Sequence, residues 1–199
     1  MTVHATGWNR LQRGLLCVLA VLLWVTAHAN QGAGPRVERI EPLITESQLT
    51  LDLDLSFELE RLVTDAAERG VPLYFTVDLK ITSPRWWWLD RVLVETTLTR
   101  RLTYNALTQQ WRVATGDLFV PASTLNEALA ILKQVRAWPV APSDRFERNQ
   151  RYDGRVRLRL DTSQLARPLQ LEAANRSAWA LVTPWALFDF SIQQAGLSK

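Results

Sequence analysis

The acidic side chains that could do chemistry lie on predicted strands. In LTLDLDLSF, Asp52 and Asp54 alternate with leucines, so both lie on one strand face, about 7 Å apart. Such a pair could suit hydrolysis by two carboxylates or the binding of a hard cation. Asp78 falls on the equivalent face of a later strand. We expect a solvated acidic face, and a carboxylate-dependent hydrolase remains an alternative function.

Arginines form a second row. Arg155, Arg157 and Arg159 repeat every second residue, so three guanidinium groups line one strand face. They could bind the phosphates of a lipid headgroup or lipopolysaccharide. Cross-strand ion pairs with the aspartates above would need no ligand, and we favour that interpretation. Arg100 shares a predicted face with apolar residues, so either a bulge rotates it outward or it belongs to a partly buried ion pair.

Three tryptophans stand side by side in SPRWWWLD. Successive strand residues point to opposite faces, so Trp86 and Trp88 would share one side and Trp87 the other. Two of them could close the end of a core while the third packs under a loop. The cluster could instead contact a protein partner or a membrane interface. Four later aromatic residues are expected in a final core strand: Trp179, Trp185, Phe188 and Phe190.

The first 29 residues predict a secretory signal peptide. Arg10 and Arg13 precede an apolar run, and Ala27 and Ala29 match the small residues of a cleavage site. The run is short for a transmembrane helix, which needs about 20 apolar residues. We expect cleavage after Ala29 and a periplasmic protein, with anchoring to the inner membrane by an uncleaved signal as the alternative. The predicted organisation is a signal peptide (1–29), a flexible lead-in (30–35) and a single domain (36–199).

Cleavage would remove the residues on which many enzymes depend. Both histidines, His4 and His28, and the only cysteine, Cys17, lie in the signal segment. Histidine-based triads, cysteine nucleophiles and zinc sites built on either residue are then excluded. Without Arg10 and Arg13, the 23 basic residues fall to 21, against 20 acidic residues. This balance gives no reason to expect nucleic acid binding. We predict a non-enzymatic protein with no cofactor and no metal.

Hydrophobic periodicity predicts an α+β fold. We expect a mostly antiparallel β-sheet or small β-sandwich with two packed helices, preceded by the N-terminal signal helix. A capping box of Thr124 and Glu127 begins the second helix, and Gly70 ends the first. The predicted helices are 58–70 and 123–139. The predicted strands are 49–57, 73–82, 91–107, 111–115, 151–161, 167–173 and 177–192.

Several segments resemble one family in order along most of the mature chain. They include ERGVPLYFTVDLKI (68–81), RWWWLD (85–90), RRLTYNALTQQWRV (100–113) and WALVTPWALFDF (179–190). Together they resemble the uncharacterised secreted bacterial family called domain of unknown function 4390. The resemblance implies export across the inner membrane of Gram-negative bacteria. It implies no activity, cofactor or catalytic residue.

These observations predict an exported envelope protein that binds the periplasmic part of another envelope protein. The expected contact residues are Trp86, Trp87 and Trp88, followed by Arg155, Arg157 and Arg159. Peripheral membrane contact is compatible with the same residues. The alternative is a lipid or amphiphile carrier, which would need a continuous pocket lined by aliphatic side chains.

Overall fold

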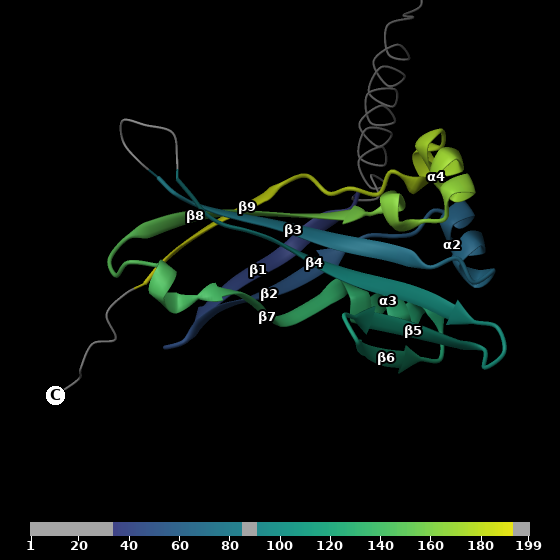
Figure 1. Ribbon diagram of the computed structural model, residues 1–199, viewed down its shortest axis with the longest axis horizontal. Helices are drawn as coiled ribbons and strands as arrows, with labels where there is room; N and C mark the ends of the chain where they lie inside the picture. The colour runs from purple at the N-terminus through teal and green to yellow at the C-terminus, as the bar shows by residue number, and fades with distance from the viewer. Residues whose placement is uncertain (1–33, 85–90, 193–199) are drawn as a thin grey trace, which may run out of the picture. The chain divides into compact units, whose positions relative to one another are not determined.

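Two antiparallel β-sheets face each other across one apolar core (Figure 1). The computed structural model describes residues 34–84 and 91–192, so the predicted signal peptide with Ala27 and Ala29, and the three adjacent tryptophans, lie outside the described residues. The smaller sheet has the order β1-β2-β7. Its strands are β1 (Arg36–Ile44), β2 (Gln48–Ser56) and β7 (Gln134–Pro142).

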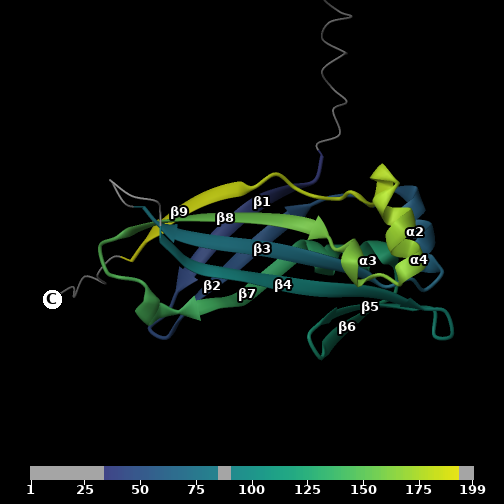
Figure 2. The same ribbon diagram turned by 45° about the horizontal axis from the view of Figure 1, so that its top comes forward.

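The larger sheet has the order β6-β5-β4-β3-β8-β9 and is antiparallel throughout. The smaller sheet runs obliquely behind it, as Figures 1 and 2 both show. At one edge β1 contacts both β8 and β9, which brings the two sheets together there. The strands are β3 (Leu73–Ser83), β4 (Arg91–Asn105), β5 (Gln110–Thr115), β6 (Leu118–Ala122), β8 (Arg151–Leu160) and β9 (Ala186–Ser191).

Strict alternation along the strands builds the core, as the sequence predicted. In β2, every leucine from Leu49 to Leu55 is buried, and the residues between them face outward. In β3 and β8 the same period buries residues such as Val77 and Val156. Because one strand face is apolar and the other polar, each sheet has one buried and one outer face. The α+β sandwich is therefore confirmed.

Three α-helices are described: α2 (Arg61–Glu68), α3 (Leu125–Lys133) and α4 (Arg167–Ala174). α3 contacts β5 and β6 of one sheet and β2 and β7 of the other. α2 and α4 lie at one end of the sandwich, where both contact the short 3-10 helix η3 (Ser177–Trp179) (Figures 1 and 2). Trp179 is buried in η3, so its expected place in the core is right, although it does not lie in a strand.

Local signals identified the end of α2 and the start of α3. Gly70 adopts a φ of +90° just after α2, a conformation that glycine accepts without strain. Thr124 Oγ1 accepts a hydrogen bond from Glu127 N at 3.2 Å at the start of α3. The Glu127 carboxylate accepts from Ser123 N at 2.8 Å, one residue before the position that a capping box would use.

Three predicted elements differ in the structure. The strand predicted over 177–192 is reduced to β9 (Ala186–Ser191), because η3 (Ser177–Trp179) and Pro184 interrupt it. Residues 167–173 form helix α4 instead of an edge strand, because Pro168 lies in its first turn, where the missing N–H costs nothing. The helix predicted over 123–139 ends at Lys133, and β7 begins at Gln134. Pairing of β7 with β2 buries Val135 and Trp138, which overrides helical continuation. β1, β6 and β7 were not predicted as strands.

The outermost strand β6 has an unusual surface. Leu118, Phe119 and Val120 are all exposed, and Pro121 follows them. A two-residue turn with Gly116 at φ +57° joins β5 to β6, so Thr115 and Leu118 form a hydrogen-bonded pair. From this pair onward, every second residue of β6 directs its N–H and C=O toward β5. The backbone N–H and C=O positions of Phe119 and Pro121 therefore face the open edge. Pro121 therefore removes an N–H from that edge.

Candidate binding surface on the six-stranded sheet

The predicted arginine row lies on the outer face of the six-stranded sheet. β8 pairs with β3 so that Arg159 is opposite Thr76, Arg157 opposite Asp78, and Arg155 opposite Lys80. This register brings Asp78 to the arginines, whereas Asp52 and Asp54 belong to β2 of the other sheet. Of the three aspartates considered as partners, only Asp78 meets the row.

Asp78 binds two of the three arginines. Its Oδ2 accepts from Arg157 Nε at 2.8 Å and from Arg159 Nε at 3.2 Å. Arg159 also pairs with Asp161, Nη1 to Oδ1, at 3.2 Å. Cross-strand pairing, the interpretation favoured from the sequence, therefore accounts for Arg157 and Arg159.

Asp161 directly follows β8 and pairs with Arg159. Burial raises the pKa of Asp161, but hydrogen bonds from Ser163 and Gln164 and the charge of Arg159 outweigh it. The pKa of Asp161 therefore lies below its usual value. The carboxylate stays ionised at neutral pH and keeps Arg159 engaged.

Arg155 has a different environment. None of the described carboxylates lies within ion-pair distance of it. Its guanidinium carbon lies 4.9 Å from the centre of the Trp185 ring, and that of Arg157 lies 4.5 Å from the same ring. A guanidinium stacked on an indole face keeps the donors on its edge available for a carboxylate or a phosphate.

Backbone pairing before β9 brings Trp185 onto this face. Leu160 N donates to Leu181 O at 2.8 Å, and Thr183 N donates to Leu158 O at 2.9 Å. These bonds extend the edge of β8 up to Pro184. Trp185 was expected in the core; it is instead partly exposed over the arginines. Alternation in WALFDF could have shown this, because Trp185, Leu187 and Asp189 share one face opposite the buried Phe190.

A groove of about 750 Å³ lies beside this stack on the same sheet. A smaller pocket of about 300 Å³ adjoins it, and the two share Lys80 and Arg155. Within the groove, Arg151 is paired with Asp189 at 3.4 Å and with Asp153 at 3.8 Å. The groove is lined by Lys80, Thr82, Val92, Arg151, Asp153, Gly154, Arg155, Leu187, Phe188 and Asp189.

The groove extends to the ends of the two strands that residues 84–90 connect. β3 ends at Ser83 and β4 begins at Arg91. Thr82 and Val92, which pair with each other next to this connection, both line the groove. Trp86, Trp87 and Trp88 belong to the connection but lie outside the described residues. Of the predicted contact residues, the structure thus places Arg155 at the groove and Arg157 and Arg159 in the adjoining pocket.

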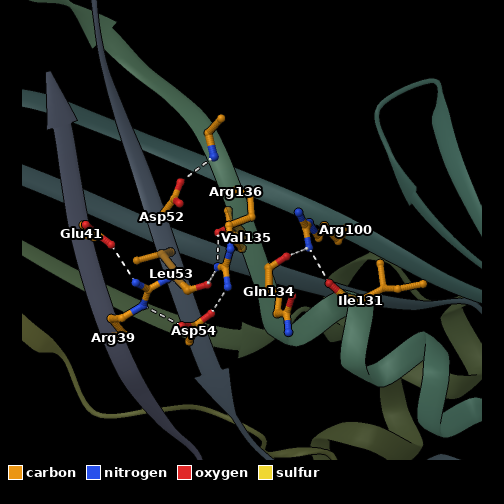
Figure 3. A network of polar contacts seen from close by, with 11 residues as sticks. Arg39, Glu41, Asp52, Leu53, Asp54, Arg100, Ile131, Gln134, Val135 and Arg136 are labelled. Carbon is orange, nitrogen blue, oxygen red and sulfur yellow. Dashed lines mark hydrogen bonds and ion pairs between the residues drawn. The ribbon is translucent and has the colours of Figure 1, made fainter. Parts of the chain in front are cut away.

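The two acids of β2 hold the smaller sheet together (Figure 3). Asp54 accepts from Arg39 of β1, Nε to Oδ2, at 2.7 Å, and from Arg136 of β7. Hydrogen bonds from Arg136 and then Arg39 lower the pKa of Asp54, and those arginine charges add to the effect. Asp52 Oδ1 accepts from Ala137 N at 2.7 Å.

Asp52 fixes a bulge in β7. Leu51 is opposite Trp138 and Leu53 is opposite Val135, so Arg136 and Ala137 both face Asp52. Ala137 has a φ of +49°, a conformation that costs a residue with a Cβ. The hydrogen bond from Ala137 N to the Asp52 carboxylate helps to offset this cost. Both acids of β2 therefore have structural partners.

Arg100 joins the two sheets from inside the sandwich. Its Nη1 donates to Ile131 O at 2.9 Å and to Gln134 O at 2.7 Å, where α3 ends and β7 begins (Figure 3). Burial lowers the pKa of Arg100, and the charge of Arg136 lowers it further. Neither sequence interpretation was right, because Arg100 binds carbonyl groups at a helix C-terminus instead of a carboxylate.

Across 34–84 and 91–192, no helix has both the length and the apolar character needed to cross a membrane. In the same ranges, no three His, Cys, Asp or Glu side chains are grouped so that they could hold a metal ion.

Comparison with known proteins gives one match. No curated protein and no solved structure matches the chain significantly. A family model described as "Domain of unknown function (DUF4390)" matches residues 33–189, which is most of the chain. The match confirms the resemblance found in the sequence, and the chain belongs to the DUF4390 family.

Proposed function

We propose that this chain is a non-enzymatic, exported envelope protein that binds a protein partner through the groove on its six-stranded sheet. The observation that carries the proposal is a groove lined by exposed apolar side chains and Arg155, with Arg157 and the Trp185 indole in the pocket that adjoins it. Aromatic residues and arginine are enriched where protein interfaces carry most of their binding energy. In the sequence, the predicted contact residues Trp86, Trp87 and Trp88 lie between Thr82 and Val92, which line this groove.

The same geometry gives less support to the alternatives. A lipid carrier needs an aliphatic pocket, whereas leucines and aromatic side chains of both sheets fill the space between them. A carboxylate-dependent hydrolase needs an acid that is available to a substrate. Asp52, Asp54 and Asp78 instead bind a backbone N–H or arginines.

The test replaces Leu187 with a photo-crosslinking amino acid and expresses this variant in a Gram-negative bacterium. Leu187 is 79% exposed in the groove, and Leu171 is 72% exposed on α4, so Leu171 provides a matched control. We expect a discrete crosslinked envelope protein from Leu187 and none from Leu171. Equal products from both positions, or no protein product from Leu187, would rule the proposal out.

A further inference from the structure

We infer that the groove recognises a partner segment that carries a carboxylate next to a large apolar side chain, and that Lys80 and Arg155 bind the carboxylate. This inference rests on the proposed function and specifies the chemistry of the partner. It follows from how the charges of the outer face are distributed, from the position of Trp185, and from the apolar wall of the groove.

Among the cations that line the groove and the adjoining pocket, Lys80 and Arg155 are the most available. Asp78 is already shared by Arg157 and Arg159. Among the described carboxylates, Lys80 has only Glu95 at 3.8 Å, and the Glu95 side chain is largely exposed, so this pair is weak. Lys80 and Arg155 lie opposite each other on neighbouring strands and form the wall between the groove and the smaller pocket. An anionic group placed there would contact both cations.

Trp185 prepares Arg155 for binding. Its indole lies against the guanidinium groups of both Arg155 and Arg157, which restricts their rotamers before any partner arrives. Less side-chain entropy is then lost on binding. The guanidinium edge, with its parallel N–H donors, matches the two oxygens of a carboxylate.

The apolar wall begins one strand away. Leu187 is opposite Arg155 in the β8–β9 pairing and points to the same outer face. Val92 lies across the groove on β4 and is also exposed. An apolar side chain next to the bound carboxylate would cover Leu187 and Val92, which otherwise face water.

A partner segment fits this surface better than an anionic membrane does. The site is a groove, which an extended segment can enter. Asp153 and Asp189 line the same groove and hold Arg151. A layer of anionic headgroups would bring many negative charges against these two carboxylates, whereas one carboxylate at Lys80 and Arg155 avoids them.

The experiment uses the peptide acetyl-Leu-Glu-Leu-amide and its isostere with Gln in place of Glu. Binding to the mature chain is followed by NMR, through the Arg155 side-chain N–H and the Lys80 side chain. We expect saturable shifts at both residues, with the Glu peptide binding about tenfold more tightly than the Gln peptide, since a carboxylate makes charge-assisted hydrogen bonds. Arg155→Gln and Lys80→Gln should each remove most of this preference. Arg167→Gln, which removes an exposed arginine from α4, should leave it unchanged.

Equal affinity for the two peptides, or no shift at millimolar peptide, would overturn the inference. The inference would also be overturned if neither peptide bound while the chain bound phosphatidylglycerol vesicles, and Arg155→Gln abolished that vesicle binding. Crosslinking from Leu187 separates this inference from the proposed function. If Leu187 still crosslinks a protein in the Arg155→Gln and Lys80→Gln variants as efficiently as in the wild type, the partner exists but the carboxylate site is wrong.

Discussion

Arginine side chains occupy different environments in this protein. Arg100 and Arg136 donate to backbone carbonyl groups, and each fixes the course of β7. Arg155 stacks on Trp185 with the donors of its edge still available. The same residue type thus serves structure where carbonyl groups surround it and, in our proposal, recognition where a ring supports it. Substitutions should separate the two roles.

Arg100→Met is expected to lower the free energy of unfolding by about 2 kcal/mol, because two inward-facing carbonyl groups lose a charged donor. Urea unfolding at neutral pH measures the change. Arg101→Met provides the control, since Arg101 is the next residue on β4 and is exposed. That variant should change the free energy by less than about 0.5 kcal/mol. Equal effects of the two substitutions would show that the carbonyl contacts of Arg100 contribute nothing.

Asp54→Asn should give a pH-dependent loss of stability. The folded-state pKa of Asp54 lies below its unfolded value, so its ion pairs stabilise the fold above the unfolded pKa of about 3.9. This contribution is lost as the pH falls through the folded-state pKa. Urea unfolding should therefore show wild type more stable than Asp54→Asn at pH 7, with the difference shrinking in acid. Asp117→Asn, in the exposed β5–β6 turn, should show little difference at either pH. A gap between wild type and Asp54→Asn that is constant with pH would contradict the ion pairing.

At the scale of elements, sequence periodicity predicted the strands whose pattern is local. It missed the boundaries that depend on pairing with a distant strand. β2, β3 and β8 alternate, so their core faces could be predicted. The α3–β7 boundary could not be, because residues 134–139 continue a helical pattern until β2 competes for them. The arginine row was visible in the sequence. Its partner Asp78 was one of three candidates, because only the β3–β8 register distinguishes them.

The contact between β8 and β9 leads to a further prediction about stability. A Cβ added at Gly154 would collide with the Phe188 ring, which lies over it from the paired strand. Gly154→Ala should therefore cost about 1–3 kcal/mol of unfolding free energy by overpacking. Thermal unfolding measures it, with Gly34→Ala as the control because nothing lies within 4 Å of a Cβ there. The cost should largely disappear in a Phe188→Ala background. If it persists there, the ring is not its cause.

At the scale of the whole molecule, the expected biology depends on export. Residues 1–29 carry the features of a secretory signal, and the described part of the chain contains neither histidine nor cysteine. A protein released in this way would work with the carboxylates, arginines and aromatic residues described above. The proposed partner must then be within reach of the periplasm.

The intact mass of the protein purified from the envelope tests this directly. We expect the mass of residues 30–199, because Ala27 and Ala29 provide the small residues that a signal peptidase requires. Ala29→Arg should leave the precursor uncleaved and held at the inner membrane. Recovery of the full-length chain from the cytoplasm of wild-type cells would contradict export.

The sequence of the outermost strand β6 affects how readily this protein would aggregate at high local concentration. Three exposed apolar residues on a free sheet edge are a template on which another chain could add a strand and begin a fibril. Pro121 removes one donor from that edge, so an incoming strand would find an incomplete ladder. A proline at this position therefore disfavours self-association through the β6 edge.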